Sequence, residues 1–269
     1  MANTASAAAP LRRALRGRAP GLRVERSLWS GGADVVAGVD EVGRGSWAGP
    51  LTVAAVVADP GTRIYKVRDS KMLNASEREV LHDRIIGWAR AVSVGHATVA
   101  ECAELGMADA QRLAARRAVD GLSLDVDHVL VDGSWNFLKP RPDDPTDSDG
   151  TGADPGDGPD VTTIVRGDAS SLSIAAASVV AKVTRDRLMV EAAQRYPAYW
   201  FASNKGYPCP RHIAALAAWG PCAIHRRRWV FMDDLRWSGV PRLHPPCEDT
   251  EPRLFDPAAG GAAAANGRL

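Results

Sequence analysis

The chain has 269 residues, of which 45% are hydrophobic and 24% charged, proportions typical of a globular protein with a sizeable core. Its 33 Lys and Arg residues almost balance its 32 Asp and Glu residues, and a net charge of +1 argues against a protein that coats nucleic acid through bulk charge. Residues 139–160 hold seven Asp and only two basic residues, however, so the rest of the chain carries a charge of +6.

The first half of the chain predicts three strands and two helices. A β-branched run at residues 35–40, a glycine-rich turn and a second apolar run at residues 51–58 are typical of an antiparallel pair of strands. Asn74 and Glu77 have the spacing of a capping box, so we expect a helix to begin there and to end near residue 90. Alternation over residues 91–99 predicts a third strand, and a helix is expected over residues 100–119.

The second half predicts two short strands and one long helix. Short apolar runs lie at residues 128–132 and 162–165, and a helix rich in small residues is expected over residues 171–193. Strands that alternate with helices after an antiparallel start indicate one mixed α/β sheet covered by helices.

The composition divides the chain into a folded region and three polar or small-residue segments. Residues 1–30 carry six Arg and one Glu, and we expect them to form a basic, flexible arm. Residues 31–240 are expected to form one domain, in which the acidic residues 139–160 are a solvated loop inserted between two strands. The Ala- and Gly-rich residues 241–269 have no amphipathic pattern, which predicts a disordered tail.

Cysteine usage and the N-terminal residues favour a cytoplasmic protein. The cysteines are too few and too scattered for a disulfide scaffold, and they include no C-x-x-C pair for zinc. They are Cys102, Cys209, Cys222 and Cys247. No apolar run approaches the roughly 18 residues that a membrane span needs. The first residues place small side chains before arginines, which is the reverse of the order in a secretory signal.

Two adjacent acids, Asp40 and Glu41, follow the first apolar strand in the sequence GVDEVGRGSWAGP. Carboxylates buried at a strand end destabilise the fold unless something neutralises them. Neighbours in a regular strand point to opposite faces, so a shared site would require a local bulge. The alternative is that the two residues simply begin a polar turn.

Two further acids hold matching positions. Asp132 ends the strand at residues 128–132, and Asp168 follows the strand at residues 162–165 and precedes the long helix. Strand-terminal carboxylates at one edge of a sheet suit hard divalent cations such as Mg²⁺. Four of them could hold two ions about 4 Å apart, the arrangement used for phosphodiester cleavage.

The glycines near Asp40 do not form a dinucleotide-binding fingerprint. Their spacing is G-x-G-x-x-x-G, and the residues that follow are typical of a strand rather than a helix. Gly43 and Gly45 instead permit a close approach of the backbone to a ligand, with Arg44 between them available to a phosphate.

Several basic and aromatic residues are candidates for contacts with a phosphate chain. Lys71, Lys182 and Lys205 lie in Gly-, Ser- or Asp-bearing or helical segments around the acids and suit a phosphate or carboxylate neighbour, although a solvated surface lysine is the favoured interpretation of each one taken alone. Tyr207 lies in a turn and could stack on a sugar or base, or pack in the core. His212 could be a ligand or a helix cap, and we expect a structural role for it. The run HRRRW at residues 225–229 is either a backbone-binding patch or a solvated helix face.

Taken in order, the motifs of this chain resemble those of ribonuclease HII. They are GVDEVGRGSWAGPLTVAAVV, the DSK that ends at Lys71, the VLVDG that ends at Gly133, the RGD that ends at Asp168, AAASVVAKVTRD and NKGYPCPRH. The resemblance spans about residues 35–225 and identifies residues 31–240 as the catalytic domain. It implies an RNase H-like fold, with a mixed five-stranded sheet flanked by helices and a small helical C-terminal extension.

The resemblance also implies an activity. Members of this family are Mg²⁺- or Mn²⁺-dependent endonucleases that hydrolyse the RNA strand of RNA–DNA hybrids and cut 5′ of ribonucleotides embedded in duplex DNA. Two metal ions would activate a water for in-line attack and stabilise the departing 3′ oxygen, leaving 5′-phosphate and 3′-hydroxyl ends. The expected partners are these two nucleic-acid duplexes, with no membrane, and the expected state is a monomer.

Carried onto this sequence, the resemblance assigns the site residues. The catalytic and metal-binding residues would be Asp40, Glu41, Asp132 and Asp168. The substrate-binding residues would be Gly43, Arg44, Gly45, Lys71, Lys182 and Tyr207. The glycines and the arginine between them would surround the ribose and sense its 2′-hydroxyl, and the tyrosine would stack on the following deoxyribose. Lys71 would lie near the phosphate backbone and Lys182 near the site.

The sequence departs from the family in two places, and two alternatives to the family activity stay open. The acidic insert lengthens the connection between Asp132 and Asp168, and His225 is followed by three arginines and a tryptophan where relatives tend to have arginine and then Ser-Phe. One alternative is a DNA nuclease of the same fold, such as a resolvase or transposase core, which would not need to sense a 2′-hydroxyl. The other is a module that binds hybrids without cutting them.

Overall fold

The computed structural model describes residues 19–139 and 158–227. These residues form two compact units. The first contains the described residues up to Asp40, together with residues 54–93, 122–139 and 158–183. The second contains residues 41–53, 94–121 and 184–227. Most of the predicted acidic loop, and the whole of the predicted tail at residues 241–269, lie outside the described residues.

Within the described part of the chain, five strands form one sheet in the order β3-β2-β1-β4-β5. The strands are β1 (Val36–Val42), β2 (Leu51–Val57), β3 (Ala91–Ala97), β4 (His128–Asp132) and β5 (Asp160–Ile164). β1 pairs in parallel with β4, and β4 in parallel with β5. All five strands were predicted. The first four begin within one residue of their predicted starts, and β5 begins two residues earlier than predicted.

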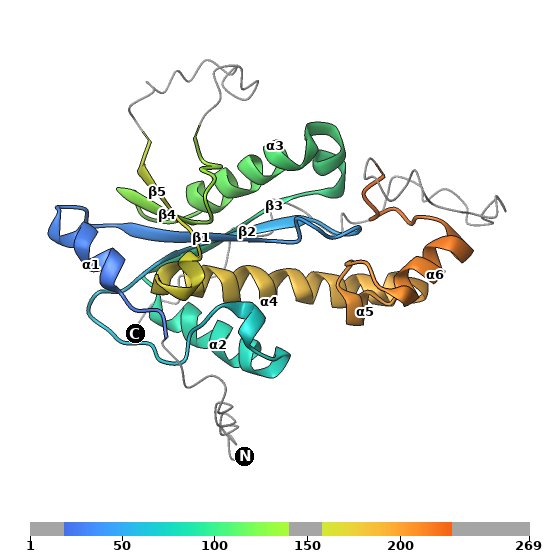
Figure 1. Ribbon diagram of the computed structural model, residues 1–269, viewed down its shortest axis with the longest axis horizontal. Helices are drawn as coiled ribbons and strands as arrows, with labels where there is room; N and C mark the ends of the chain where they lie inside the picture. The colour runs from blue at the N-terminus through green and yellow to red at the C-terminus, as the bar shows by residue number, and fades with distance from the viewer. Residues whose placement is uncertain (1–18, 140–157, 228–269) are drawn as a thin grey trace, which may run out of the picture. The chain divides into compact units, whose positions relative to one another are not determined.

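In the first unit, helix α2 (Ala75–Trp88) begins where the capping box predicts. Asn74 Oδ1 accepts a hydrogen bond from Glu77 N at 2.9 Å, and Glu77 Oε2 accepts one from Asn74 N at 2.8 Å. Leu81, Ile85 and Trp88 are buried, and their spacing places them on one face of the helix. Figure 1 shows α2 on the same side of the strands as the beginning of α4 (Leu172–Arg195).

Strand β1 packs closely on the beginning of α4. A Cβ atom added to Gly38 would lie 2.2 Å from the carbonyl carbon of Ser173 and 2.3 Å from the backbone nitrogen of Ile174. Residues 175–177 of the helix are fully buried alanines, so no long side chain holds the helix away from the strand. This contact explains the run of small residues that the sequence shows in this helix.

Helix α1 (Arg23–Ser30) lies within the segment for which we expected a flexible arm, and the sequence analysis missed it. Its Glu25 is fully buried. Glu25 Oε1 accepts hydrogen bonds from Ser171 Oγ at 2.7 Å, from Ser173 N at 2.9 Å and from Ser173 Oγ at 2.8 Å. The carboxylate thus lies at the N-terminus of α4, where the helix dipole favours a negative charge.

In the second unit, helix α3 (Val99–Asp120) also begins with a capping box, formed by Thr98 and Glu101. It packs closely on β3, because a Cβ atom added to Gly95 would lie 2.1 Å from Ala114 O. Gly106 has φ 79° and interrupts the helix with a kink. We had predicted an uninterrupted helix over most of this range, and one glycine accounts for the difference.

His96, on β3, predicts a pH dependence of stability. Burial, together with the positive charges of Arg185 and Arg117, lowers the pKa of His96 to about 4. In the unfolded chain a histidine titrates near pH 6.5, so between pH 4 and 6.5 the unfolded chain binds a proton that the folded protein does not. The stability that this residue contributes is therefore complete above about pH 6.5 and is lost as the pH falls toward 4.

From this residue we expect the free energy of unfolding to be about 2 kcal/mol lower at pH 5 than at pH 7.5. Urea unfolding at the two pH values measures the difference. His96→Gln should remove this part of the pH dependence, and a variant that kept all of it would contradict the assignment.

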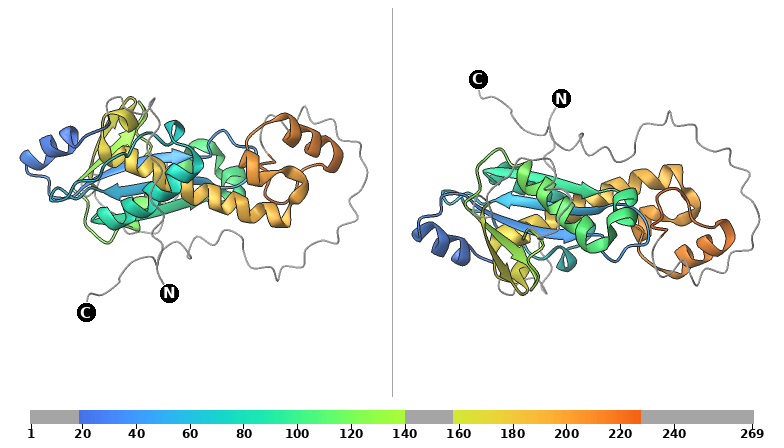
Figure 2. Two further views of the ribbon diagram at one scale, coloured as in Figure 1. Left: turned by 90° about the horizontal axis from the view of Figure 1, so that it is seen from below. Right: turned by 90° about the horizontal axis from the view of Figure 1, so that it is seen from above.

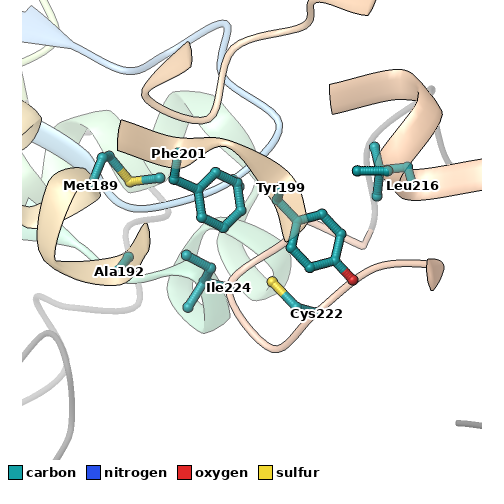
Figure 3. Close-up of a cluster of buried hydrophobic side chains, with 9 residues drawn as sticks. Met189, Ala192, Tyr199, Phe201, Leu216, Cys222 and Ile224 are labelled. Carbon is teal, nitrogen blue, oxygen red and sulfur yellow. The ribbon is translucent and has the colours of Figure 1, made fainter. Parts of the chain in front are cut away.

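The C-terminal part of the second unit has a core of its own. It contains the short helices η5 (Pro197–Tyr199), α5 (Phe201–Asn204) and α6 (Pro210–Trp219), which follow α4 (Figure 2). The rings of Tyr199 and Phe201 stack with centroids 5.5 Å apart, and Tyr199 Oη donates a hydrogen bond to Gly220 O at 2.6 Å. Around them are Met189, Ala192, Leu216, Cys222 and Ile224 (Figure 3).

These short helices match the helical C-terminal extension that the resemblance implied. Over the described residues, the structure has no helix that is both long and apolar enough to cross a bilayer.

Candidate active site

Asp40 and Asp132 lie side by side at the carboxyl ends of two parallel strands. β1 and β4 pair with Val39 opposite Val131, so extending the register by one residue places Asp40 beside Asp132. Paired residues of neighbouring strands point to the same face of the sheet, and the strands are about 4.8 Å apart. Asp40 is buried and Asp132 half-buried, so both carboxylates are partly withdrawn from water.

Asp168 follows Gly167, whose backbone is hydrogen-bonded to Asp132 at the same strand end. It lies in the 3₁₀ helix η4 (Gly167–Ala169), between β5 and α4, and it is buried. Gly167 N donates a hydrogen bond to Asp132 Oδ1 at 2.7 Å. A Cβ atom at Gly167 would lie 2.5 Å from Ile174 Cδ1 and 3.3 Å from Asp132 Oδ1, so both side chains pack closely on this glycine.

The charges of the three aspartates act on Lys71, which lies in the 3₁₀ helix η2 (Ser70–Met72). Burial lowers the pKa of Lys71, but four carboxylates outweigh burial and raise this pKa above its ordinary value. In order of effect, they belong to Asp69, Asp40, Asp168 and Asp132. Burial raises the pKa of Asp168, and the charges of Asp69 and Asp132 raise it further. A cluster of mutually repelling acids therefore faces one ammonium group.

These carboxylates have the chemistry of a divalent-metal site without forming a closed set of ligands. Hard cations take carboxylate oxygens, and a cation would relieve the repulsion that raises the pKa of Asp168. Across residues 19–139 and 158–227, no three His, Cys, Asp or Glu side chains lie close enough to hold one ion together. A bound cation would have to draw the carboxylates toward itself.

Glu41, the fourth predicted acid, follows Asp40 along β1 and is half-buried. It belongs to the second unit, whereas the three aspartates belong to the first. In a regular strand, adjacent side chains point to opposite faces. Its link to the other acids is therefore its position in the chain, next to Asp40.

In the second unit, the glycine loop (residues 43–50) contacts the tyrosine turn (residues 204–207). Gly43 N donates a hydrogen bond to Tyr207 Oη at 3.2 Å. Trp47 N and Ala48 N both donate to Gly206 O, at 2.8 and 3.3 Å. Gly43 and Gly206 have φ 89° and 82°, in the region that side chains rarely tolerate. The structure thus brings together two segments that the sequence analysis linked only by resemblance.

The other predicted substrate-binding residues differ in exposure. Arg44 and Gly45 are exposed, and a Cβ atom at Gly45 would meet no atom within 4 Å, so this part of the glycine loop borders open space. Lys71 is exposed in the first unit, and Lys182 is half-buried on α4.

The family model for ribonuclease HII matches residues 37–232. The chain belongs to the ribonuclease HII family. The ribonuclease HII of Streptomyces avermitilis is 39% identical over 233 residues, which cover 86% of this chain and 93% of that protein. The ribonuclease HII of Geobacter metallireducens is 43% identical over 210 residues, which cover 76% of this chain and 90% of that protein.

Solved structures of ribonuclease HII agree with this assignment. The crystal structure of ribonuclease H2 from Pyrococcus horikoshii has a TM-score of 0.60 and 27% identity, covering 75% of this chain and 97% of that one. The ribonuclease HII in the PCNA complex from Archaeoglobus fulgidus has a TM-score of 0.58 and 26% identity, covering 72% of this chain and 95% of that one. As a ribonuclease HII, the chain is a divalent-metal-dependent endonuclease that acts on RNA–DNA hybrids.

Two histidines of this ribonuclease HII support the tyrosine turn. His212 Nδ1 lies 2.9 Å from Tyr207 O, its Nε2 lies 2.9 Å from His225 Nε2, and His225 Nδ1 lies 2.9 Å from Cys222 N. Because the carbonyl must accept and the backbone N–H must donate, these partners assign both imidazoles as neutral, with His225 donating to His212. His212 therefore has the structural role that we expected.

The arginine-rich run differs from both predicted alternatives at its first arginine. Arg226 is buried, and it donates hydrogen bonds from Nε to Gly49 O at 3.1 Å and from Nη1 to Arg44 O at 3.0 Å. It supports the glycine loop from inside. Arg227 is exposed, and residues 228 and 229 lie outside the described part of the chain. A cavity of about 330 Å³ beside Arg226 is otherwise lined by residues 102–107, none of them a predicted site residue.

Sequence reasoning missed two residues that shape the site. Asp69 exerts the largest of the four charge effects on Lys71, and its Oδ1 accepts a hydrogen bond from Lys71 N at 2.9 Å. Its signal was present in the DSK motif, in which only the lysine was assigned a role. Arg185, in the motif AAASVVAKVTRD, is fully buried although an arginine on a helix is usually solvated.

Proposed function

We propose that this ribonuclease HII cuts duplex DNA on the 5′ side of single embedded ribonucleotides as well as the RNA strand of hybrids, as a cytoplasmic monomer. Two divalent ions, Mg²⁺ or Mn²⁺, would be held by Asp40, Glu41, Asp132 and Asp168. The observation that carries the proposal is the parallel register of β1 and β4, which sets Asp40 beside Asp132. The hydrogen bond from Gly167 N to Asp132 Oδ1 supports a place for Asp168 at the same strand end.

In this proposal the metal ions supply the cleavage chemistry, and the residues of the chain position the ions and the substrate. Bound divalent ions would supply an activated water and a positive charge for the departing 3′ oxygen, giving 5′-phosphate and 3′-hydroxyl ends. The carboxylates would fix the position of that charge relative to the phosphate that is cut. The Gly167 N–H donates to Asp132 Oδ1, and the other carboxylate oxygen of Asp132 would be available to hold a cation. Lys71 would contact a phosphate of the substrate next to the acids, and Lys182 would lie near the site.

The glycine loop and Tyr207 would recognise the junction between the ribonucleotide and the following deoxyribonucleotide. Backbone groups from Gly43 to Gly45, with Arg44 between them, would approach the 2′-hydroxyl, because glycine leaves room for a ligand. The ring of Tyr207 would stack on the next deoxyribose. The hydrogen bond from Gly43 N to Tyr207 Oη supports this division, since it joins the two elements within one unit.

A metal titration on three duplexes tests the proposal. The duplexes are all-DNA, DNA with one ribonucleotide, and an RNA–DNA hybrid, each with Mg²⁺ and with Mn²⁺. We expect metal-dependent cutting of the last two and a single cut 5′ of the ribonucleotide. Cutting of the all-DNA duplex would favour a DNA nuclease of the same fold, and salt-sensitive binding without products would favour a binding module.

Tyr207→Ala should reduce kcat/KM on the single-ribonucleotide duplex about tenfold more than on a long hybrid, because a stacking contact contributes about 1–3 kcal/mol. Tyr207→Phe is the matched control: it keeps the ring and removes the oxygen that accepts from Gly43 N, so its loss should be smaller. Steady-state kinetics on both substrates measure the effect. Equal losses on the two substrates would argue against junction recognition.

A further inference from the structure

Arg185 lies at the point where the glycine loop, the tyrosine turn and helix α4 meet in the second unit. Its side chain is fully buried. Its guanidinium donates four hydrogen bonds, and the acceptors are Pro50 O at 2.9 Å, Lys205 O at 2.9 Å, Ser46 Oγ at 2.7 Å and Ala48 O at 2.9 Å. Three of the acceptors belong to the glycine loop and one belongs to the tyrosine turn.

The same guanidinium also contacts the two groups proposed to recognise the junction. The carbon Cζ of Arg185 lies 5.4 Å from the centroid of the Tyr207 ring, within the range of a cation–π contact. At the other side, a Cβ atom added to Gly43 would lie 2.2 Å from Arg185 Nε. One side chain therefore limits how close the loop and the ring can come.

Ser46 extends this arrangement to the backbone of Gly43. Its Oγ accepts from Arg185 Nη2 and lies 2.9 Å from Gly43 O, to which it donates. The position of Gly43 is thus set by Arg185 twice, once through direct contact and once through the hydroxyl of Ser46.

The chemistry of the acceptors requires arginine. A planar guanidinium presents donors in several fixed directions, whereas a lysine ammonium is a point charge with three donors. Burial lowers the pKa of Arg185, so the surrounding structure must compensate for a buried charge, which the four acceptors do. An apolar side chain at this position would leave these four acceptors without donors.

We propose that Arg185 is a positioning residue for substrate selection: it sets the distance between the Gly43 backbone and the Tyr207 ring. The proposal rests on the function proposed above for these two groups. The contacts of Arg185 that carry the proposal run to the glycine loop and to the tyrosine turn. Loss of Arg185 should therefore change which duplex is cut more than it changes the cutting step.

The test compares kcat/KM on the single-ribonucleotide duplex with kcat/KM on a long hybrid. The ratio of these two values does not depend on what fraction of the enzyme is folded, so a merely structural role would not move it. Arg185→Lys keeps the charge and cannot satisfy four acceptors at once, and we expect it to lower the ratio about tenfold. Ser46→Ala leaves the charge and most of the acceptors in place, and we expect a loss of a few-fold.

Arg187→Met is the matched control, because Arg187 is an exposed residue of the same helix. It should leave the ratio at the wild-type value, and a ratio as low as that of Arg185→Lys would overturn the assignment. An unchanged ratio in folded Arg185→Lys and Ser46→Ala would also overturn it. Should Arg185→Lys not fold, Ser46→Ala alone decides between the outcomes.

If the proposed function were wrong, the wild-type enzyme itself would give a different result. In that case the wild-type enzyme would not cut the single-ribonucleotide duplex at all, while the hybrid was still cut. If the wild type cuts both duplexes, the variants report on Arg185 alone.

Discussion

Asp40→Asn is expected to leave a folded protein that no longer cuts either ribonucleotide-containing substrate. The substitution keeps the shape of the side chain and removes the charge that a divalent cation needs, so we expect a loss of about a thousandfold or more in kcat. The fold should tolerate the change, because asparagine has nearly the same shape and Lys71 keeps the charges of Asp69, Asp168 and Asp132. Single-turnover cleavage and thermal unfolding, each with and without Mg²⁺, measure the two effects.

The metal also provides a readout that is independent of cleavage. A ligand that binds only the folded protein raises its melting temperature, so Mg²⁺ or Mn²⁺ should stabilise the wild type and should stabilise Asp40→Asn much less. Asp83→Asn is the control, since Asp83 is an exposed residue of α2 with a side chain 76% accessible. An Asp40→Asn enzyme that cut at the wild-type rate would remove Asp40 from the site.

Gly38→Ala is expected to cause the largest loss of stability among simple substitutions in the first unit. The new methyl group would lie within 2.3 Å of backbone atoms of Ser173 and Ile174, and backbone atoms cannot rotate away as a side chain can. Forcing β1 and α4 apart should lower the free energy of unfolding by about 3 kcal/mol or more. Urea unfolding at neutral pH measures this loss.

Gly87→Ala provides the matched control. Gly87 lies in helix α2, and a Cβ atom there would meet nothing within 4 Å. In a helix, alanine is favoured over glycine by roughly 1 kcal/mol, so this variant should be slightly more stable than the wild type. If the two variants lost equal stability, the close approach at Gly38 would not be the cause.

The strands and the helix starts could be predicted because they depend on local signals. The capping box of Asn74 and Glu77 fixed the start of α2, and short apolar runs located β4 and β5. The acids at the strand ends followed from these elements, since the ends of neighbouring parallel strands meet at one edge of a sheet. Asp40 beside Asp132 is the clearest case.

The parts that could not be predicted depend on contacts between distant residues. Helix α1 was not predicted because its sequence is rich in arginine. No residue near Glu25 in the sequence indicates that the Glu25 carboxylate contacts the start of α4. Arg185 and Arg226 are buried through acceptors supplied by the glycine loop, which lies far away in sequence. A sequence pattern shows where a charged residue stands along a helix, and it does not show that backbone carbonyls elsewhere will surround it.

The contact between Gly43 and Arg185 also bears on how the protein can change over time. A side chain at position 43 would enter space that the arginine fills, and a smaller residue at position 185 would leave the carbonyls of the glycine loop without their donor. Replacing both residues together would restore neither the donor nor a residue that tolerates φ 89° at position 43, so both positions are expected to resist change. A combinatorial library that randomises both together should return mainly Gly43 with Arg185 among its active clones.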